Sequence, residues 1–220
     1  MESVLYLLWD LKFKVGHSSR TISDCVQLGL DDLTIRTSML EKRYLCGSRD
    51  LFEELETTLK KKVFSKKASN FVEGKLSERA ERHLKHANAR YMLEPNIKEG
   101  KGGLRDLHTL YWISKYIYKT DNIQSLIEKK IFKKSELEIF TEAENFLWFI
   151  RCKIHQISGY ANEKLTFNIQ ADLAKGLNIE DDNSRRGVEI FMQKYFLQAK
   201  NVGDLTRIFL TAIEENYLAK

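Results

Sequence analysis

The 220-residue sequence is poor in residues that interrupt or cross-link a chain. It holds one proline and three cysteines, and no apolar run reaches the ~18 residues of a membrane span. The cysteines, Cys25, Cys46 and Cys152, are odd in number and have no metal-ligand spacing, which argues against a disulfide framework. No basic segment precedes the apolar N-terminal residues as in a signal peptide. We therefore expect buried free thiols in a soluble, cytoplasmic protein without membrane contact.

Charge of both signs is abundant, with 36 Lys and Arg against 31 Asp and Glu and a net charge of +5. Part of the excess lies in one basic cluster: Lys60, Lys61, Lys62, Lys66 and Lys67. A basic patch suits nucleic acid, a nucleotide or an acidic partner, whereas a solvated helix face is its plain interpretation. No basic strand is interleaved with base-stacking aromatic residues, so we expect no nucleic-acid partner.

Apolar residues recur at helical spacing through most of the chain, which favours a mainly α fold. Helices are predicted over residues 4–9, 21–28, 31–45, 50–63, 66–89, 104–118, 135–157, 168–177 and 186–218, with a short one from about 123. Lys12-Phe-Lys-Val15 alternates instead, as a half-buried strand does. We therefore expect a helical bundle domain over 46–220, preceded over 1–45 by a short α/β remnant of one helix and one strand.

One segment between two predicted helices stands out, Leu93-Glu-Pro-Asn-Ile-Lys-Glu-Gly-Lys-Gly-Gly-Leu-Arg-Asp106. It contains three glycines and three basic residues: Gly100, Gly102, Gly103, Lys98, Lys101 and Arg105. Glycines allow close backbone approach to a ligand, and a helix that begins near Gly103 favours an anion at its start. We predict a phosphate- or carboxylate-binding turn; the alternative is an ordinary solvated turn. A Walker-type loop is excluded, because no Ser or Thr follows Lys101.

Further short motifs accompany this segment: Leu8-Trp-Asp10, Val15-Gly-His-Ser-Ser-Arg-Thr21, Asp32-Leu-Thr34, Phe146-Leu-Trp-Phe-Ile-Arg151 and Leu165-Thr-Phe167. Together, and in this order, they resemble the bacterial PII uridylyltransferases over nearly the whole chain. The resemblance implies a polymerase-β-type nucleotidyltransferase that moves UMP from UTP to a tyrosine of the PII nitrogen-signalling protein, with Mg²⁺ as cofactor. It also implies an HD domain that removes UMP and ACT domains that sense glutamine.

Carried over by position, Lys98, Arg105 and the backbone of Gly100, Gly102 and Gly103 would line the nucleotide cleft. No catalytic residue is assigned, and Asp10 is the one candidate for a metal-binding carboxylate. The other motif residues are His17, Arg20, Glu94, Asn96 and Asp106. Glu94 and Asp106 suit an alternative, structural role in capping or in pairing with Arg105. Lys101 departs from the family, which usually has proline there.

The sequence contains no Asp-x-Asp pair, the motif with which this family binds its metal ions. We therefore expect a fragment, inactive alone, that begins after the catalytic Gly-Gly and Asp-x-Asp strand and lacks the HD and ACT domains. Its opening helix and strand would then be the end of the nucleotidyltransferase sheet. Two alternatives stay open: a subunit of a split enzyme whose separate partner chain carries the catalytic strand, and a non-enzymatic helical module that binds a nucleotide or an acidic protein surface.

Overall fold

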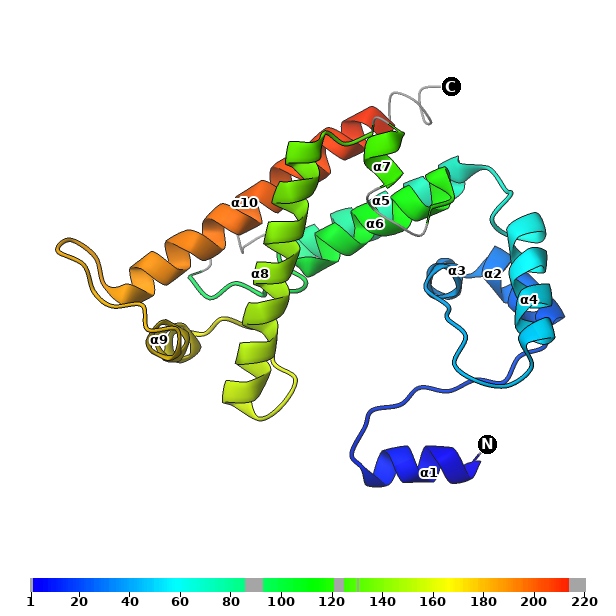
Figure 1. The fold of residues 1–220 in the computed structure, drawn as a ribbon, viewed down its shortest axis with the longest axis horizontal. Coiled ribbons are helices and arrows are strands. Elements are labelled where there is room, and N and C mark those ends of the chain that lie inside the picture. The colour runs from blue at the N-terminus through cyan, green and yellow to red at the C-terminus, as the bar shows by residue number, and fades with distance from the viewer. Residues whose placement is uncertain (1, 86–92, 121–124, 130, 214–220) are drawn as a thin grey trace. The chain divides into compact units, whose positions relative to one another are not determined.

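The computed structural model describes residues 2–85, 93–120, 125–129 and 131–213. The chain divides into two compact units, Met1–Lys66 and Lys67–Lys220 (Figure 1). Within the described residues every regular element is an α-helix, and none is a strand. The helical prediction is therefore confirmed. The predicted functional division between residues 45 and 46 stays a prediction.

The first unit consists of four helices: α1 (Glu2–Asp10), α2 (Ile22–Asp31), α3 (Leu33–Leu40) and α4 (Arg49–Lys62). Three of them begin at side-chain caps. Thr21 and Asp24 form a reciprocal capping box at α2, while Asp32 caps α3 and Ser48 caps α4. These residues satisfy amides that a helix start leaves without a partner, which explains where the helices begin. Helix α3 ends at Leu40, five residues before the predicted end.

The predicted strand at Lys12–Val15 is wrong, and so is the α/β remnant to which it was assigned. Lys12 lies in the left-handed region with φ 64°. Its amide donates to the carbonyl of Trp9 at 2.8 Å, and the amide of Phe13 donates to the carbonyl of Leu8 at 3.0 Å. This pair of bonds is a Schellman motif, which closes the end of α1. Lys12 and Phe13 therefore terminate α1, and Lys14 and Val15 form no strand.

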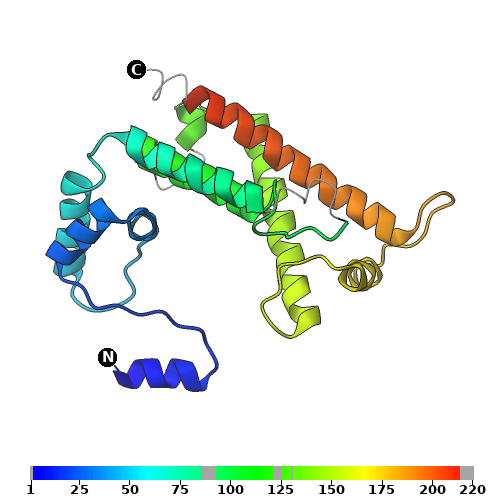
Figure 2. The same ribbon diagram turned by 180° about the vertical axis from the view of Figure 1, so that it is seen from behind.

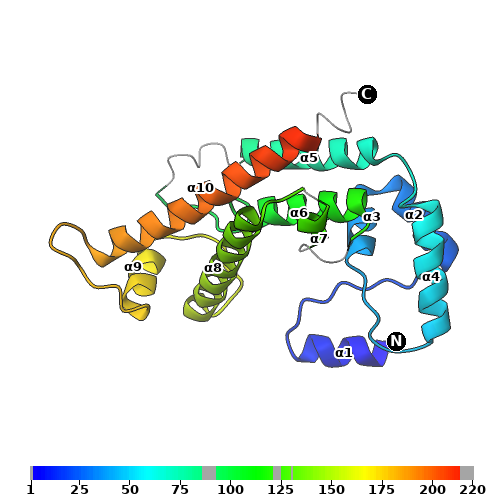
Figure 3. The same cartoon turned by 45° about the horizontal axis from the view of Figure 1, so that its top comes forward.

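The second unit contains the remaining helices: α5 (Ala68–Lys85), α6 (Leu104–Tyr118), α7 (Ser125–Glu128), α8 (Lys134–Ser158), α9 (Phe167–Gly176) and α10 (Gly187–Ile213). Helix α10 packs against α6, α8 and α9, and α5 packs against α6 (Figures 1 and 2). Figure 3 shows α9 beneath the N-terminal half of α10. The ends predicted near residues 89 and 218, and the start near 123, lie outside the described residues.

The core of the second unit is built from apolar stripes at helical spacing. On α8 the stripe predicted from the sequence is fully or almost fully buried: Phe140, Ala143, Leu147, Ile150 and Ile154. On α10 the buried apolar residues are Phe191, Tyr195, Val202, Leu205, Phe209, Leu210 and Ile213. Burial raises the pKa of the Tyr195 hydroxyl, so this phenol stays neutral. These residues form the face of α10 that packs against α6, α8 and α9.

The segment that leads into residues 93–106 is held by a second segment far along the chain. The amide of Ile97 donates to the carbonyl of Glu163 at 2.8 Å, and the amide of Leu165 donates to the carbonyl of Pro95 at 2.9 Å. Asn96 and Lys164 thereby form an isolated antiparallel bridge. These bonds fix the entrance of the loop against the connection between α8 and α9.

The expected burial of the cysteines is wrong. Cys46 and Cys152 are exposed and Cys25 is partly buried, although all three are free thiols. Burial raises the pKa of the Cys25 thiol above its ordinary value, despite the nearby charge of Arg20. No helix in the described part of the chain is long and apolar enough to cross a membrane.

Removing one side chain from the α8 stripe tests this packing. Leu147 is completely buried, so Leu147→Ala should lower the free energy of unfolding by about 2–5 kcal/mol, because it leaves a cavity. The neighbouring Phe149 is 47% exposed, and Phe149→Ala should cost much less. Urea denaturation followed by circular dichroism measures both. Equal losses in the two variants would contradict the assigned buried face.

Candidate functional site

The loop before α6 is closed by its own hydrogen bonds. The side-chain oxygen of Asn96 accepts from the amides of Lys98 at 3.0 Å and Glu99 at 2.7 Å. The amide of Gly100 donates to the carbonyl of Asn96 at 2.9 Å, and that of Gly103 donates to the carbonyl of Gly100 at 2.9 Å. Asn96 thus organises the turn, which gives this motif residue a local structural role.

The first amides of α6 also have partners within the loop. Leu104 donates to the carbonyl of Ile97 at 3.1 Å, and Arg105 donates to the carbonyl of Lys98 at 2.9 Å. A helix start binds an anion through amides that lack such partners. An anion at this turn would therefore be bound mainly by side chains. The glycines and the helix start had instead indicated binding by backbone amides.

Gly102 joins the loop to the middle of α10. It has φ 76°, and a Cβ placed on it would lie 2.1 Å from the backbone carbonyl oxygen of Ala199. Only glycine combines this left-handed conformation with so close a backbone approach. Its amide also donates to Oδ2 of Asp106 at 2.9 Å. The backbone of Gly102 is therefore fixed on both sides.

Asp106 is completely buried and lies against Arg79, Arg82 and His83 of α5. Arg82 Nη2 donates to its Oδ1, His83 Nε2 lies 3.0 Å from both carboxylate oxygens, and Arg79 Nε lies 3.4 Å from Oδ1. Burial raises the pKa of Asp106, but the bond and charge of His83, the charge of Arg79 and the amide of Gly102 outweigh it. The pKa therefore falls to about 2, so Asp106 is ionised at neutral pH.

Sequence reasoning did not find this cluster. The available signal was the spacing of Arg79, Arg82 and His83, since positions i, i+3 and i+4 share one helix face. The buried partner is 23 to 27 residues away in sequence, and only the folded structure brings it there.

Lys98 and Arg105 come together around one carboxylate at the edge of the loop. Arg105 Nη2 lies 3.3 Å and Lys98 Nζ lies 3.8 Å from the same oxygen of Glu99, and all three side chains are 29% exposed. The guanidinium carbon of Arg105 lies 5.5 Å from the ring centre of Trp112. Two predicted nucleotide-binding residues thus form one partly exposed basic pair, with one negative charge between them.

Glu94 lies at the start of α9. Its Oε1 accepts from the amide of Phe167 at 2.9 Å, and its Oε2 lies 3.1 Å from Lys164 Nζ. These contacts, the Phe167 bond first, lower the pKa of Glu94. Gln170 also ties the two segments, because its Nε2 donates to the carbonyl of Leu93 at 2.5 Å as well as to that of Leu165 at 2.8 Å. In this structure Glu94 therefore caps a helix from 73 residues away.

Asp10, His17 and Arg20 belong to the first unit. All three are exposed, and the His17 ring lies 5.9 Å from that of Trp9. Among the described residues, no three His, Cys, Asp or Glu side chains are grouped so that they could hold a metal ion. The described carboxylates thus do not fit Mg²⁺, which prefers several oxygen ligands.

The described chain is an all-helical protein that presents a basic loop at the start of a buried helix. A profile of the GlnD PII-uridylyltransferase family matches residues 70–210, which contain this loop. The chain belongs to that family.

Curated relatives agree along the whole chain. The bifunctional uridylyltransferase/uridylyl-removing enzyme of Ruegeria pomeroyi is 51% identical over 99% of this chain and 24% of its own length. Enzymes of the same name from Cereibacter sphaeroides and Azospirillum brasilense are 48% and 47% identical over 99% and 97% of the chain, and 23% of their own lengths. The chain thus spans about a quarter of the length of these relatives. No solved structure matches it.

Neutralising Asp106 tests the buried cluster. Asp106→Asn should lower the free energy of unfolding at pH 7 by about 3 kcal/mol, because it removes the buried negative partner of two partly buried arginines. Asp172→Asn, on the exposed face of α9, is the matched control and should be nearly neutral. The pH dependence adds a check that needs no variant. A carboxyl with a lowered folded-state pKa stabilises above its unfolded value of ~3.9 and loses this contribution as the pH falls towards about 2. Equal stability of the two variants would contradict the assignment.

Adding one methyl group to Gly102 tests the docking of the loop on α10. Gly102→Ala should destabilise the protein by several kcal/mol, because the methyl group meets the carbonyl of Ala199 and the backbone is left-handed. Gly176→Ala is the control, since nothing lies within 4 Å of a Cβ there. Thermal unfolding compares the two. If Gly102→Ala melts like the wild type, the loop does not pack as described.

Proposed function

We propose that this chain is the helical part of a uridylyltransferase that transfers UMP from UTP to a tyrosine of the PII signalling protein. Membership of the family supports the proposal, as does the near-complete match of the chain to bifunctional uridylyltransferase/uridylyl-removing enzymes. The structural observation that supports it most directly is the basic pair at the edge of the loop, Lys98 and Arg105.

In this proposal the side chains of Lys98 and Arg105 counter the charge of the UTP triphosphate. Both are partly exposed, and Glu99 holds them together on one side of the loop. A guanidinium donates two parallel hydrogen bonds to phosphate oxygens, whereas an ammonium acts as a point charge. Gly100, Gly102 and Gly103 contribute indirectly, because they shape the turn that positions these side chains.

The Mg²⁺ that the family requires is held elsewhere in this proposal. The carboxylates that would clamp it belong to an Asp-x-Asp strand, a motif that these 220 residues do not contain. We therefore assign no metal-dependent step to this chain and keep Asp10 outside the mechanism. A catalytic strand, from the same longer protein or from a separate chain, would supply the metal site and the chemistry.

A nucleotide titration tests this division of roles. The purified chain should bind UTP by calorimetry without transferring UMP to PII in the presence of Mg²⁺. Lys98→Ala and Arg105→Ala should each weaken UTP binding about tenfold, because each removes a charged hydrogen-bond donor worth about 1.5–3 kcal/mol. Lys175→Ala, at an exposed lysine in the last turn of α9, is a charge-matched control and should bind normally.

Two results would contradict the proposal. Unchanged UTP affinity in both loop variants would remove Lys98 and Arg105 from the nucleotide site. Uridylylation of PII by the purified chain alone would show that the chemistry does not need another catalytic strand. ATP serves as the specificity control in the same titration. A non-enzymatic binding module, in contrast, would transfer no UMP even after a catalytic strand is added.

A further inference from the structure

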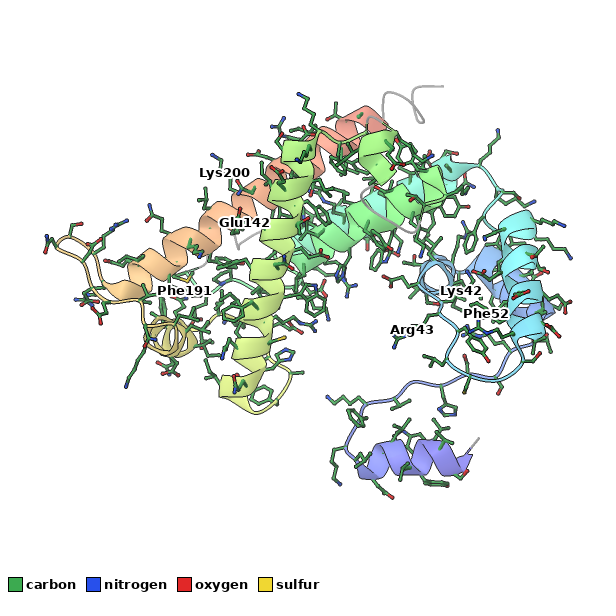
Figure 4. The ribbon with its side chains drawn as sticks, viewed as in Figure 1. Lys42, Arg43, Phe52, Glu142, Phe191 and Lys200 are labelled. Atoms are coloured by element: carbon green, nitrogen blue, oxygen red, sulfur yellow. The ribbon has the colours of Figure 1, made fainter. Side chains whose placement is uncertain are left out.

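A second basic surface lies on another part of the loop. It is a groove of about 740 Å³, and its wall includes Arg79 of α5, Lys101 of the loop, and Phe196, Lys200, Asp204 and Arg207 of α10. Figure 4 shows Lys200 on the middle of α10. Neither Lys98 nor Arg105 lines this groove. It is therefore a separate feature from the basic pair around Glu99.

The contact between Gly102 and α10 explains why two lysines meet in this groove. Gly102 lies against the backbone of Ala199, as its left-handed conformation and close approach show. Lys101 precedes Gly102 and Lys200 follows Ala199, so one backbone contact brings both lysines to the same place. The fold thus positions the lysines, although their side chains are exposed.

The groove has an excess of positive charge that the described residues do not neutralise. Asp204 is its one lining carboxylate, and it lies 3.6 Å from Arg207. The side chains of Lys101 and Lys200 make no hydrogen bond or ion pair with any described residue. Arg79 Nε lies 3.4 Å from Oδ1 of Asp106, which is an ion-pair distance, but it forms no hydrogen bond with any described residue. Like charges held together in this way favour an anionic ligand.

Size and lining favour a small ligand. Pockets that bind small molecules commonly measure about 300–1,000 Å³ and combine apolar walls with a few polar groups. Here Phe196 is 43% exposed, and Ala199 and Leu210 add apolar surface beside the cations. Several cations along one short groove match the spread of negative charge on a chain of phosphates.

We propose that this groove binds the phosphate groups of a small polyphosphate ligand, at a site separate from Lys98 and Arg105. Lys101 and Lys200 supply point charges and Arg207 a planar donor, while Arg79 adds charge from the α5 side. The phosphates belong either to a free polyphosphate or to a nucleotide, and the apolar wall at Phe196 would distinguish the two by contact with a base.

Calorimetry with inorganic tripolyphosphate tests the site directly. The wild-type chain should bind it, and the double variant Lys101→Gln/Lys200→Gln should lose this binding or weaken it at least tenfold. Lys153→Gln/Lys175→Gln removes the same number of charges from α8 and α9 and should leave the groove unchanged. Lys101, Lys200 and Lys175 are exposed and Lys153 is partly exposed, and circular dichroism checks that each variant folds.

The same titration separates this inference from the proposed function. With two sites, tripolyphosphate binds with two equivalents in the wild type and with one in either Lys101→Gln/Lys200→Gln or Lys98→Ala/Arg105→Ala. If only the groove exists, the second variant binds like the wild type. Tighter binding of UTP than of tripolyphosphate at the groove, lost in Phe196→Ala, would identify a nucleotide as the source. The inference is overturned if the wild type binds no tripolyphosphate, or if the control double variant loses binding equally.

Discussion

The buried carboxylate of Asp106 is the interaction on which the candidate site depends. It lies on α6, is ion-paired with Arg82 of α5, lies within hydrogen-bond distance of His83 and accepts from the amide of Gly102. A charge in a protein interior is costly unless its partners fill the surrounding space with donors. Here they do so well enough to keep the pKa far below normal. This one buried carboxylate therefore holds α5, α6 and the loop together.

The contacts of Gly102 also determine where the positive side chains of the loop lie. Gly102 is held by Asp106 and by the backbone of α10, so the residues on either side of it have fixed directions. Lys98 and Arg105 gather around Glu99, whereas Lys101 joins Lys200. A rigid backbone positions charged side chains better than a mobile one, since less order is lost when a ligand binds. The loop thus presents two basic surfaces rather than one.

Local patterns in the sequence predicted the parts of the fold that depend on neighbours within a few residues. The apolar stripe of α8 follows from helical spacing, and the helices predicted to begin near residues 21 and 50 begin there as α2 and α4. The strand at Lys12–Val15 failed because four alternating residues cannot be distinguished from a helix end followed by an extended chain. The partners of Asp106 were not predictable either, because tertiary packing alone brings α5 to α6.

The position of the basic loop was predictable from the sequence, but the groups it offers to an anion were not. Glycines before a helix suggested free amides, yet Asn96 and the carbonyls of Ile97 and Lys98 occupy most of them. What remains is a set of cationic side chains, and cations bind phosphate without cleaving it. Phosphoryl and nucleotidyl transfer also needs metal ions that stabilise the charge of the leaving group, and these need carboxylates. In the proposed function the described residues therefore hold the nucleotide, while acidic residues from another segment supply the chemistry.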